Sequence, residues 1–182
     1  MEQSLIIAGF GGQGVMSMGH MLGYAASGAK KSVTFFPSYG AEQRGGTANC
    51  TVVISDDEIG SPIATKPDVL IAMNDPSYRK FKDRVKSNGI IMINSSLIKG
   101  SGDRDDIKEC AIPVNDMAIQ IGNPKAANLV MLGAYIALTN ILAAEDIKEM
   151  IKKTLGSKAD LLEANLNAFD AGFDYIVSNN AN

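Results

Sequence analysis

The chain has 182 residues, of which 46% are hydrophobic and 20% are charged. This length and balance suit one globular domain, and we expect a single domain over residues 1–182. The net charge of −3, with no basic cluster, argues against a nucleic-acid partner. The cysteines, Cys50 and Cys110, form no C-x-x-C pair and are too few to bind an iron–sulfur cluster or a closed zinc site.

Two further features concern location. Met1, Glu2 and Gln3 lead directly into an apolar run without the basic region of a secretory signal, so we expect a cytoplasmic protein with reduced structural thiols, although spacing alone leaves a disulfide open. Residues 126–144 carry no charge, but the stretch includes polar side chains and is short for a bilayer. It predicts a helix buried in the domain or under a partner, and no membrane contact.

Short apolar runs rich in β-branched residues alternate with helical patterns along the chain. The predicted strands are Leu5 to Ala8, Val33 to Phe36, Thr51 to Ile54, Val69 to Met73, Ile90 to Asn94 and Ala111 to Val114. The predicted helices are Gly14 to Ala29, Pro76 to Lys86, a helix from Pro124, Glu145 to Leu155 and Lys158 to Val177. This order predicts a Rossmann-like α/β three-layer sandwich: a mostly parallel sheet of about six strands, helices on both faces and a helical C-terminal part.

Local signals refine this outline. No helix fits between the second and third strands, so this pair should be antiparallel or lie at an edge. Asp56, Asp57 and Glu58 predict a solvated turn, because three successive carboxylates do not converge on one ion. Asn123 is expected to cap the uncharged helix, with Pro124 at its first position, and Gly156 is placed to end the next one.

The strand Leu5 to Ala8 runs into a G-x-G-x-x-G turn, which lets backbone N–H groups approach an anion. Gly11 removes a side chain that would block a ligand, Gly12 and Gly14 permit unusual backbone angles, and Gln13 can offer its amide. No acidic residue occurs between Glu2 and Glu42, so the acid that holds the ribose in dinucleotide sites is missing. The alternative is that these glycines only allow tight packing.

A second loop, Pro37 to Thr47, leaves the second strand and should lie beside the first turn. Arg44 offers a planar fork for phosphate or carboxylate, Gly45 and Gly46 flex the loop, and a set of hydroxyl groups surrounds them. The hydroxyl-bearing residues are Ser38, Tyr39 and Thr47. A plain surface connection with an ion pair inside the loop is the alternative.

Other reactive residues lack the partners that catalysis needs. His20 is the only histidine and has no acid or nucleophile nearby in the sequence, so we expect a buried or half-buried structural role. Cys110 lacks a histidine signature for a nucleophilic thiol. The nine methionines are read as core or interface residues.

With both loops considered, nearly the whole chain resembles the gamma subunit of 2-oxoacid:ferredoxin oxidoreductases, in the branch acting on 2-oxoglutarate or branched-chain 2-oxoacids such as 2-oxoisovalerate. The resemblance is carried by the segments Gly9 to Val15, Pro37 to Cys50, Ile59 to Pro62 and Lys66 to Asn74.

The resemblance implies a complex, typical of anaerobic metabolism, that decarboxylates a 2-oxoacid, reduces ferredoxin and forms acyl-coenzyme A. Thiamine diphosphate, Mg²⁺ and iron–sulfur clusters would lie on alpha, beta and ferredoxin-like delta partner subunits, with no cofactor on this chain. The sequence agrees, because Gly102-Asp103-Arg104 only approaches the Gly-Asp-Gly motif of thiamine diphosphate sites.

This chain would be an accessory subunit, inactive when isolated, whose loops contact coenzyme A or only the partner subunits. The residues expected to form that contact are Gly11, Gly12, Gln13, Gly14, Ser38, Tyr39, Arg44, Gly45, Gly46 and Thr47. Alone, the chain could self-associate through faces that partners cover. The alternatives are a subunit of an indolepyruvate oxidoreductase and a stand-alone nucleotide-binding dehydrogenase.

Overall fold

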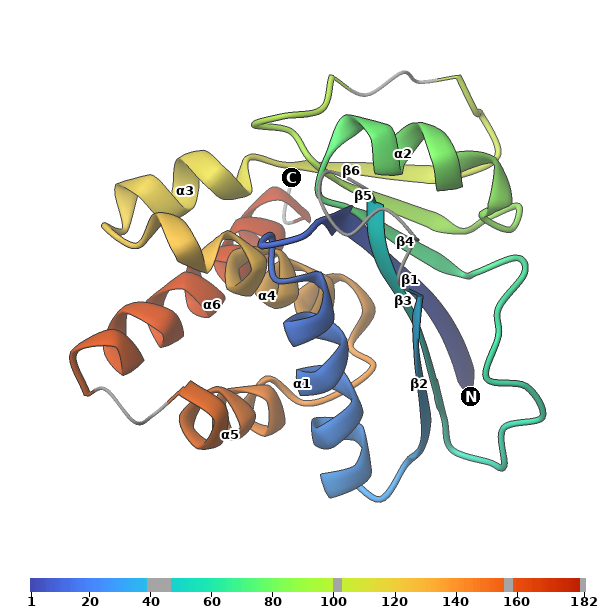
Figure 1. The fold of residues 1–182 in the computed structure, drawn as a ribbon, viewed down its shortest axis with the longest axis horizontal. Helices are drawn as coiled ribbons and strands as arrows, with labels where there is room; N and C mark the ends of the chain where they lie inside the picture. The colour runs from blue at the N-terminus through green and yellow to red at the C-terminus, as the bar shows by residue number, and fades with distance from the viewer. Residues whose placement is uncertain (39–46, 100–102, 156–158, 181–182) are drawn as a thin grey trace.

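The computed structural model describes residues 1–38, 47–99, 103–155 and 159–180. Within these ranges the chain forms one sheet of six strands with helices on both faces, so the expected α/β class is confirmed (Figure 1). The strands are β1 (Glu2–Phe10), β2 (Ser32–Ser38), β3 (Thr47–Ser55), β4 (Val69–Ala72), β5 (Ile90–Asn94) and β6 (Lys108–Ile112).

The helices follow the alternating order of the sequence. They are α1 (Val15–Gly28), α2 (Asp75–Phe81), α3 (Val114–Gln120), α4 (Ala127–Thr139), α5 (Ala144–Leu155) and α6 (Ala159–Asn180), with the 3₁₀ turns η1 (Lys82–Arg84) and η2 (Pro124–Ala126).

The strand order is β2-β3-β1-β4-β5-β6. Strands β1, β4, β5 and β6 are parallel neighbours, whereas β3 runs antiparallel to both β1 and β2. The expected antiparallel pair is therefore confirmed, with β2 at the edge. The hairpin arises because β3 follows β2 too closely for a crossover helix.

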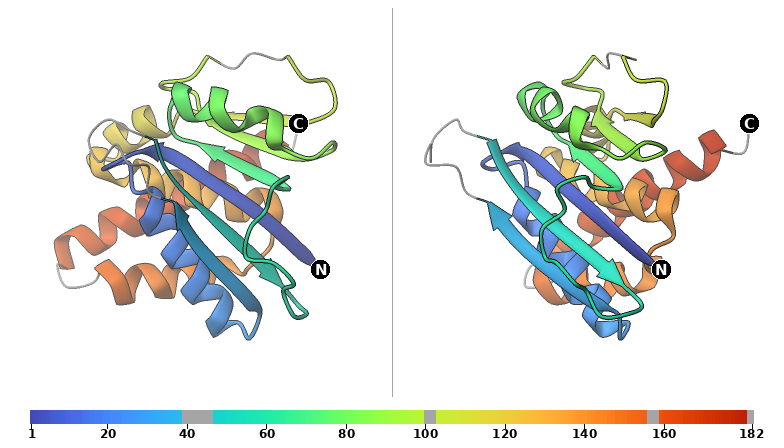
Figure 2. Two further views of the ribbon diagram at one scale, coloured as in Figure 1. Left: turned by 45° about the vertical axis from the view of Figure 1, so that its right-hand side comes forward. Right: turned by 90° about the vertical axis from the view of Figure 1, so that its right-hand side faces the viewer.

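The two faces of the sheet are covered unequally. The larger core lies between the sheet and α1, α3, α4, α5 and α6, and a smaller one lies under α2 (Figures 1 and 2). The central strands are buried on both faces, which explains the continuous apolar runs in β1 and β4. Helix α4 is buried in the larger core, so its lack of charge reflects burial within the domain.

The C-terminal helices make one unusually close contact. A Cβ atom added to Gly133 of α4 would overlap the carbonyl oxygen of Phe169, and one added to Gly172 of α6 would overlap that of Val130. Both helices therefore approach backbone to backbone, which only glycine permits. This contact fixes α4 across the sheet and with it the start of α4 beside the first glycine turn.

Several local expectations need correction. The last strand ends at Ile112, because Pro113 precedes α3 and Val114 already belongs to that helix. The helix expected over Pro76 to Lys86 ends as α2 at Phe81 and continues as the turn η1. Asn123 makes no capping bond; its side chain instead donates to Asn165 Oδ1 at 3.0 Å. His20 is exposed on α1, whereas burial was expected.

Candidate functional site

The candidate site lies where the carboxyl ends of β1 and β4 meet. Helix α1 follows β1 on one face of the sheet, and α2 follows β4 on the other face (Figure 1). Ligands of open α/β sheets bind at this kind of position, because the two connections diverge and leave a crevice between them. The glycine turn after β1 forms one wall of that crevice.

The backbone of the turn requires glycine at two positions. Gly12 has φ +92° and Gly14 has φ +75°, in the left-handed region that disfavours other residues. Gly14 is also the N-cap of α1, and it has no side chain to accept a hydrogen bond from the first N–H groups of the helix. A Cβ atom added to Gly11 would meet no described residue within 4 Å, which leaves space for a ligand among these residues.

Gln13 holds the turn from within. Its side-chain oxygen accepts hydrogen bonds from Phe10 N–H at 2.7 Å and from Asn74 Nδ2 at 2.9 Å, and its Nε2 donates to the carbonyl oxygen of Met73 at 3.1 Å. The amide expected to face a ligand is thus engaged with the ends of β1 and β4. Gln13 lines the crevice, but its hydrogen bonds define the shape of the turn.

A chain of asparagines extends this network across the sheet. Asn74 caps α2 by accepting from Ser77 N–H at 2.9 Å. Asn94, which is fully buried at the end of β5, donates to Met73 O at 3.2 Å and to Asn115 Oδ1 at 2.7 Å. Buried amides with satisfied hydrogen bonds give the crevice floor a fixed geometry.

The crevice opens into a groove toward the C-terminal helices. Its first part, of about 330 Å³, is lined by Gly12, Gln13, Met73, Asn115, Pro124, Lys125, Ala127 and Asn128. A second part, of about 230 Å³, shares Lys125 and Asn128 and continues to Leu129, Leu155 and Leu161. Lys125 thus lines both parts of the groove, and the second part combines these leucines with polar side chains.

Sequence reasoning missed Lys125 and Asn128. Lys125 is exposed at the groove, and no ion pair occupies it within the described part of the chain. Asn128 packs directly on Gly14, where an added Cβ atom would lie 2.5 Å from its Nδ2. The available signal was Gly122-Asn123-Pro124-Lys125, which marks a turn but does not show that it returns to the first loop.

The second loop meets this edge at both ends. The loop ends at Thr47, which is paired with Phe10 beside the first turn, and it begins after Ser38, which is paired with Asn49 one strand further out. Thr47 Oγ1 accepts a hydrogen bond from Lys80 of α2 at 3.2 Å. The remaining residues expected at the site, Tyr39, Arg44, Gly45 and Gly46, lie outside the described residues.

The strand order separates this site from a dinucleotide site. In dinucleotide-binding folds the ribose is held by an acid near the end of the strand beside β1. Here β3 lies between β1 and β2, which places the end of β2 about 10 Å from β1. That strand ends in Ser38 without an acid, so neither topology nor side chain favours a dinucleotide.

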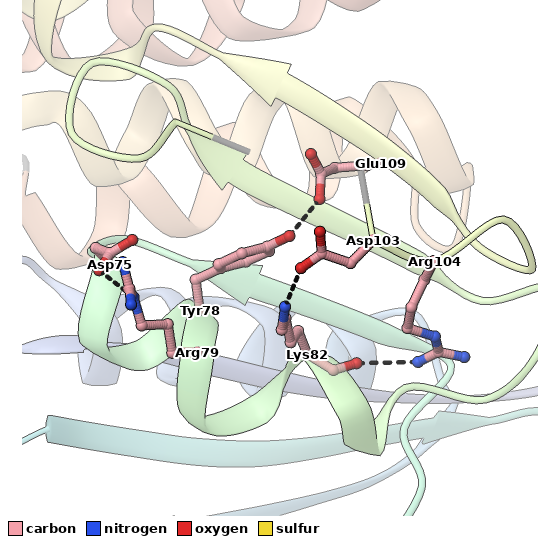
Figure 3. Close-up of polar contacts among 7 residues, drawn as sticks. All are labelled: Asp75, Tyr78, Arg79, Lys82, Asp103, Arg104 and Glu109. Atoms are coloured by element: carbon pink, nitrogen blue, oxygen red, sulfur yellow. Dashed lines mark hydrogen bonds and ion pairs between the residues drawn. The ribbon is translucent and has the colours of Figure 1, made fainter. Parts of the chain in front are cut away.

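A second polar cluster covers α2 (Figure 3). It consists of Asp75, Tyr78, Arg79, Lys82, Asp103, Arg104 and Glu109. Tyr78 donates to Glu109 at 2.7 Å, Lys82 pairs with Asp103 at 2.7 Å, and Arg104 donates to the carbonyl oxygen of Lys82 at 3.0 Å. These bonds tie β6 to α2 and the segment before β6 to η1, which is a structural role.

The thiols are not placed for cluster binding. Cys50 lies in β3 and Cys110 in β6, with three strands between them, about 19 Å apart across the sheet. Burial raises the pKa of the Cys50 thiol to about 12, and burial also raises the pKa of Cys110. Within the described ranges, no three His, Cys, Asp or Glu residues come together as metal ligands. No described helix is both long and apolar enough to span a bilayer.

The fold and the groove define an α/β domain whose glycine turn lacks the features of a dinucleotide site. Residues 4–175 match the family model described as pyruvate ferredoxin/flavodoxin oxidoreductase, and the chain belongs to this family. It is 36% identical to the 2-oxoglutarate synthase subunit KorC of Methanocaldococcus jannaschii, over 96% of this chain and 94% of that protein. The indolepyruvate oxidoreductase subunit IorB of Pyrococcus horikoshii is 27% identical.

Some relatives are much longer than this chain. It is 42% identical to the ketoisovalerate oxidoreductase subunit VorA of Methanothermobacter thermautotrophicus over 98% of its own length, but it spans only 37% of that relative. The family therefore contains this domain both as a separate chain and as part of a longer polypeptide.

Solved structures agree with this assignment. The gamma subunit of a keto/oxoacid ferredoxin oxidoreductase from Geobacter sulfurreducens superposes with a TM-score of 0.84 at 27% identity, covering 97% of this chain and 99% of that one. A 2-oxoglutarate:ferredoxin oxidoreductase from Magnetococcus marinus, with 2-oxoglutarate, coenzyme A and succinyl-CoA bound, gives a TM-score of 0.91 at 26% identity. The match covers 97% of this chain and 31% of the Magnetococcus chain.

Proposed function

We propose that the chain is the gamma-type subunit of a 2-oxoacid:ferredoxin oxidoreductase. The complex would convert a 2-oxoacid, coenzyme A and oxidised ferredoxin into acyl-CoA, CO₂ and reduced ferredoxin. The observation that carries this proposal is the alignment with the separate 2-oxoglutarate synthase subunit over nearly the full length of both chains. The similarity to ketoisovalerate and 2-oxoglutarate enzymes favours 2-oxoisovalerate or 2-oxoglutarate as the substrate.

Thiamine diphosphate, Mg²⁺ and iron–sulfur clusters belong, in this proposal, to alpha, beta and ferredoxin-like delta subunits, which would work with this chain in the cytoplasm. The residues of this chain do not fit a cluster, because its two cysteines lie far apart on the sheet. They also lack the Gly-Asp-Gly motif for thiamine diphosphate. No step of the reaction is therefore assigned to this chain.

The contribution of this chain to the reaction would be to bind and orient coenzyme A. The glycine turn and the start of α1 suit a phosphate group, because helix N–H groups and the helix dipole favour an anion. Lys125 adds a positive charge at the same groove, and Arg44 in the second loop supplies a planar fork. The second part of the groove, near Leu129 and Leu155, suits a non-phosphate part of the molecule.

The test measures coenzyme A affinity of the assembled complex. We expect Lys125→Ala and Arg44→Ala each to weaken binding about tenfold, the loss of one hydrogen bond between charged groups. Gly11→Ala should also weaken binding, because its methyl group would occupy open space at the turn. Lys66→Ala, in the loop before the amino end of β4, is the matched control.

Unchanged affinity in all three variants, with normal subunit assembly, would remove the groove and the second loop from coenzyme A binding. Titration of the isolated chain with NAD, NADP and FAD tests the dehydrogenase alternative. Tight binding of any of these, or turnover by the isolated chain, would overturn the proposed function.

A further inference from the structure

Helix α1 has an outer surface without charge. No Asp, Glu, Lys or Arg occurs between Val15 and Gly28, although the helix lies on one side of the sheet with only part of its surface covered. It packs on β1, β2 and β3 and against α5 (Figure 1). The opposite side carries exposed residues, including Tyr24 with 63% of its surface accessible. The exposed residues of this side are His20, Tyr24, Ser27 and Gly28, so the surface is uncharged although it carries polar groups. Outer faces of helices normally carry charged residues as well.

An apolar groove runs between this side of α1 and the edge strand β2. It is an open, shallow groove of about 380 Å³, lined by His20, Gly23, Tyr24, Ser27, Val33 and Phe35. The His20 ring lies 4.3 Å from the Phe35 ring and 6.3 Å from the Tyr24 ring, measured between centroids. The exposed histidine is thus part of an aromatic wall.

Strand β2 extends the uncharged surface around the edge of the sheet. It contains no charged residue, and its outer side is unpaired within the sheet. Phe35 faces α1, whereas Phe36 points to the opposite face and is 45% exposed. Long apolar edges are normally protected by charge. Aromatic residues and methionine are enriched, and charges depleted, at the centres of protein interfaces.

The lengths of the relatives indicate what covers this surface. In the ketoisovalerate relatives this domain is joined to a remainder that makes up most of the polypeptide, whereas the 2-oxoglutarate relative is almost the same length as this chain. A domain that occurs both joined and separate needs a non-covalent interface to the remainder when no linker holds it. That interface should be apolar, because obligate interfaces resemble a divided core.

We propose that the α1–β2 face, defined as α1 from Met16 to Ser27 together with β2, docks onto the polypeptide region that corresponds to the remainder of the ketoisovalerate relatives. An apolar side chain of that polypeptide enters the groove between Tyr24 and Phe35. This inference rests on the proposed function, since it takes the partner from the same complex.

Gly23 allows a test that does not depend on destabilising the chain. It lies in the middle of α1 and lines the groove, and an added Cβ atom would meet nothing within 4 Å. Gly23→Leu therefore fills the groove while improving helix propensity. The matched control is Gly28→Leu, at the end of α1 and outside the groove. A second pair is Tyr24→Glu with Ile119→Glu, because both side chains are exposed but Ile119 lies on α3.

Each variant is co-expressed with the polypeptide from the same genome that matches the uncovered part of the ketoisovalerate relative, and assembly is measured by native mass spectrometry and light scattering. We expect Gly23→Leu and Tyr24→Glu to reduce the assembled fraction at least tenfold at equal concentration. Both control variants should assemble like the unchanged chain. Thermal unfolding of each isolated chain verifies that folding is retained.

Normal assembly of Gly23→Leu and Tyr24→Glu would overturn the proposed interface while leaving the proposed function intact. Failure of the unchanged chain to assemble would instead contradict the proposed function. If the isolated chain forms a dimer that Tyr24→Glu dissolves, while the complex with the other polypeptide persists, the face belongs to a second copy and the inference is wrong.

Discussion

The side-chain oxygen of Gln13 lies 2.9 Å from Nδ2 of Asn74, and this hydrogen bond joins the turn after β1 to the turn after β4. The two turns precede helices on opposite faces of the sheet, so the bond spans the point where the crevice opens. Asn74 in turn caps α2. One amide pair therefore couples the shape of the glycine turn to the start of the helix on the other face.

Replacing Gln13 should loosen this coupling. Gln13→Ala removes its hydrogen bonds to Phe10, Asn74 and Met73, and we expect a loss of about 2–3 kcal/mol in the free energy of unfolding at about 1 kcal/mol for each bond. Urea denaturation measures this loss, and amide exchange should show faster opening at Phe10. Gln13→Glu keeps the acceptor but loses the donor, so its free energy of unfolding should lie between those of the unchanged chain and Gln13→Ala. A change below about 0.5 kcal/mol for Gln13→Ala would contradict the assigned role.

Replacement by alanine should destabilise the chain at Gly14 but not at Gly11. Gly14→Ala places a methyl group at φ +75° and against the side chain of Asn128, so we expect a loss of at least about 2 kcal/mol in unfolding free energy. Gly11→Ala should leave stability unchanged within about 0.5 kcal/mol, because its added methyl group would contact none of the residues that the structure describes. Denaturation of both variants in parallel checks this. Equal losses would show that the turn is uniformly strained.

The sheet could be predicted from the sequence because its signals are local. Buried β-branched runs marked the strands, and the short distance between β2 and β3 marked their antiparallel pairing. The glycine turn was found for the same reason, since its spacing is contained in one segment. The last strand was predicted too far along the chain, at Ala111 to Val114 instead of Lys108–Ile112. The predicted segment is as apolar as a strand, and only Pro113 separates strand from helix.

The groove could not be predicted in this way because its residues come from distant segments. Lys125 and Asn128 reach the turn only through the packing of α4, which no periodicity encodes. The exposure of His20 was missed for a similar reason. A histidine among apolar residues is typical of a half-buried helix, yet no other described element covers the side of α1 that carries His20. The charge-free composition of α1 was the available signal.

The glycine contact between α4 and α6 should be essential for stability. Gly133→Ala and Gly172→Ala each force a methyl group into the backbone of the opposite helix, so we expect losses of about 3 kcal/mol or more in unfolding free energy, the upper end for overpacking. Gly23→Ala is the matched control, because it is also a helical glycine but its methyl group meets open space. The unfolding free energy of Gly23→Ala should rise by up to about 1 kcal/mol, because alanine favours a helix more than glycine does. Chemical denaturation of the three variants separates the two outcomes, and a gain for Gly133→Ala would contradict the observed packing.

Acid should weaken the ion pair between Arg104 and Asp106, in the segment before β6. The hydrogen bond from Arg104, with a further one from Ser87, lowers the pKa of Asp106 to about 2. Because the folded pKa lies below the usual value near 3.9, the carboxylate stabilises the fold above about pH 4. This contribution is lost as the pH falls toward about 2, so part of the acid sensitivity of unfolding should fall within that window.

Asp106→Asn removes the titrating group, and we expect its unfolding free energy to be lower than that of the unchanged chain at pH 7 and to converge with it near pH 2. Urea denaturation at intervals from pH 2 to pH 7 measures the difference. Asp105→Asn is the control, because within the described residues this neighbour makes no such bond. Parallel pH curves for Asp106→Asn and the unchanged chain would mean that the contact between Arg104 and Asp106 does not persist in solution.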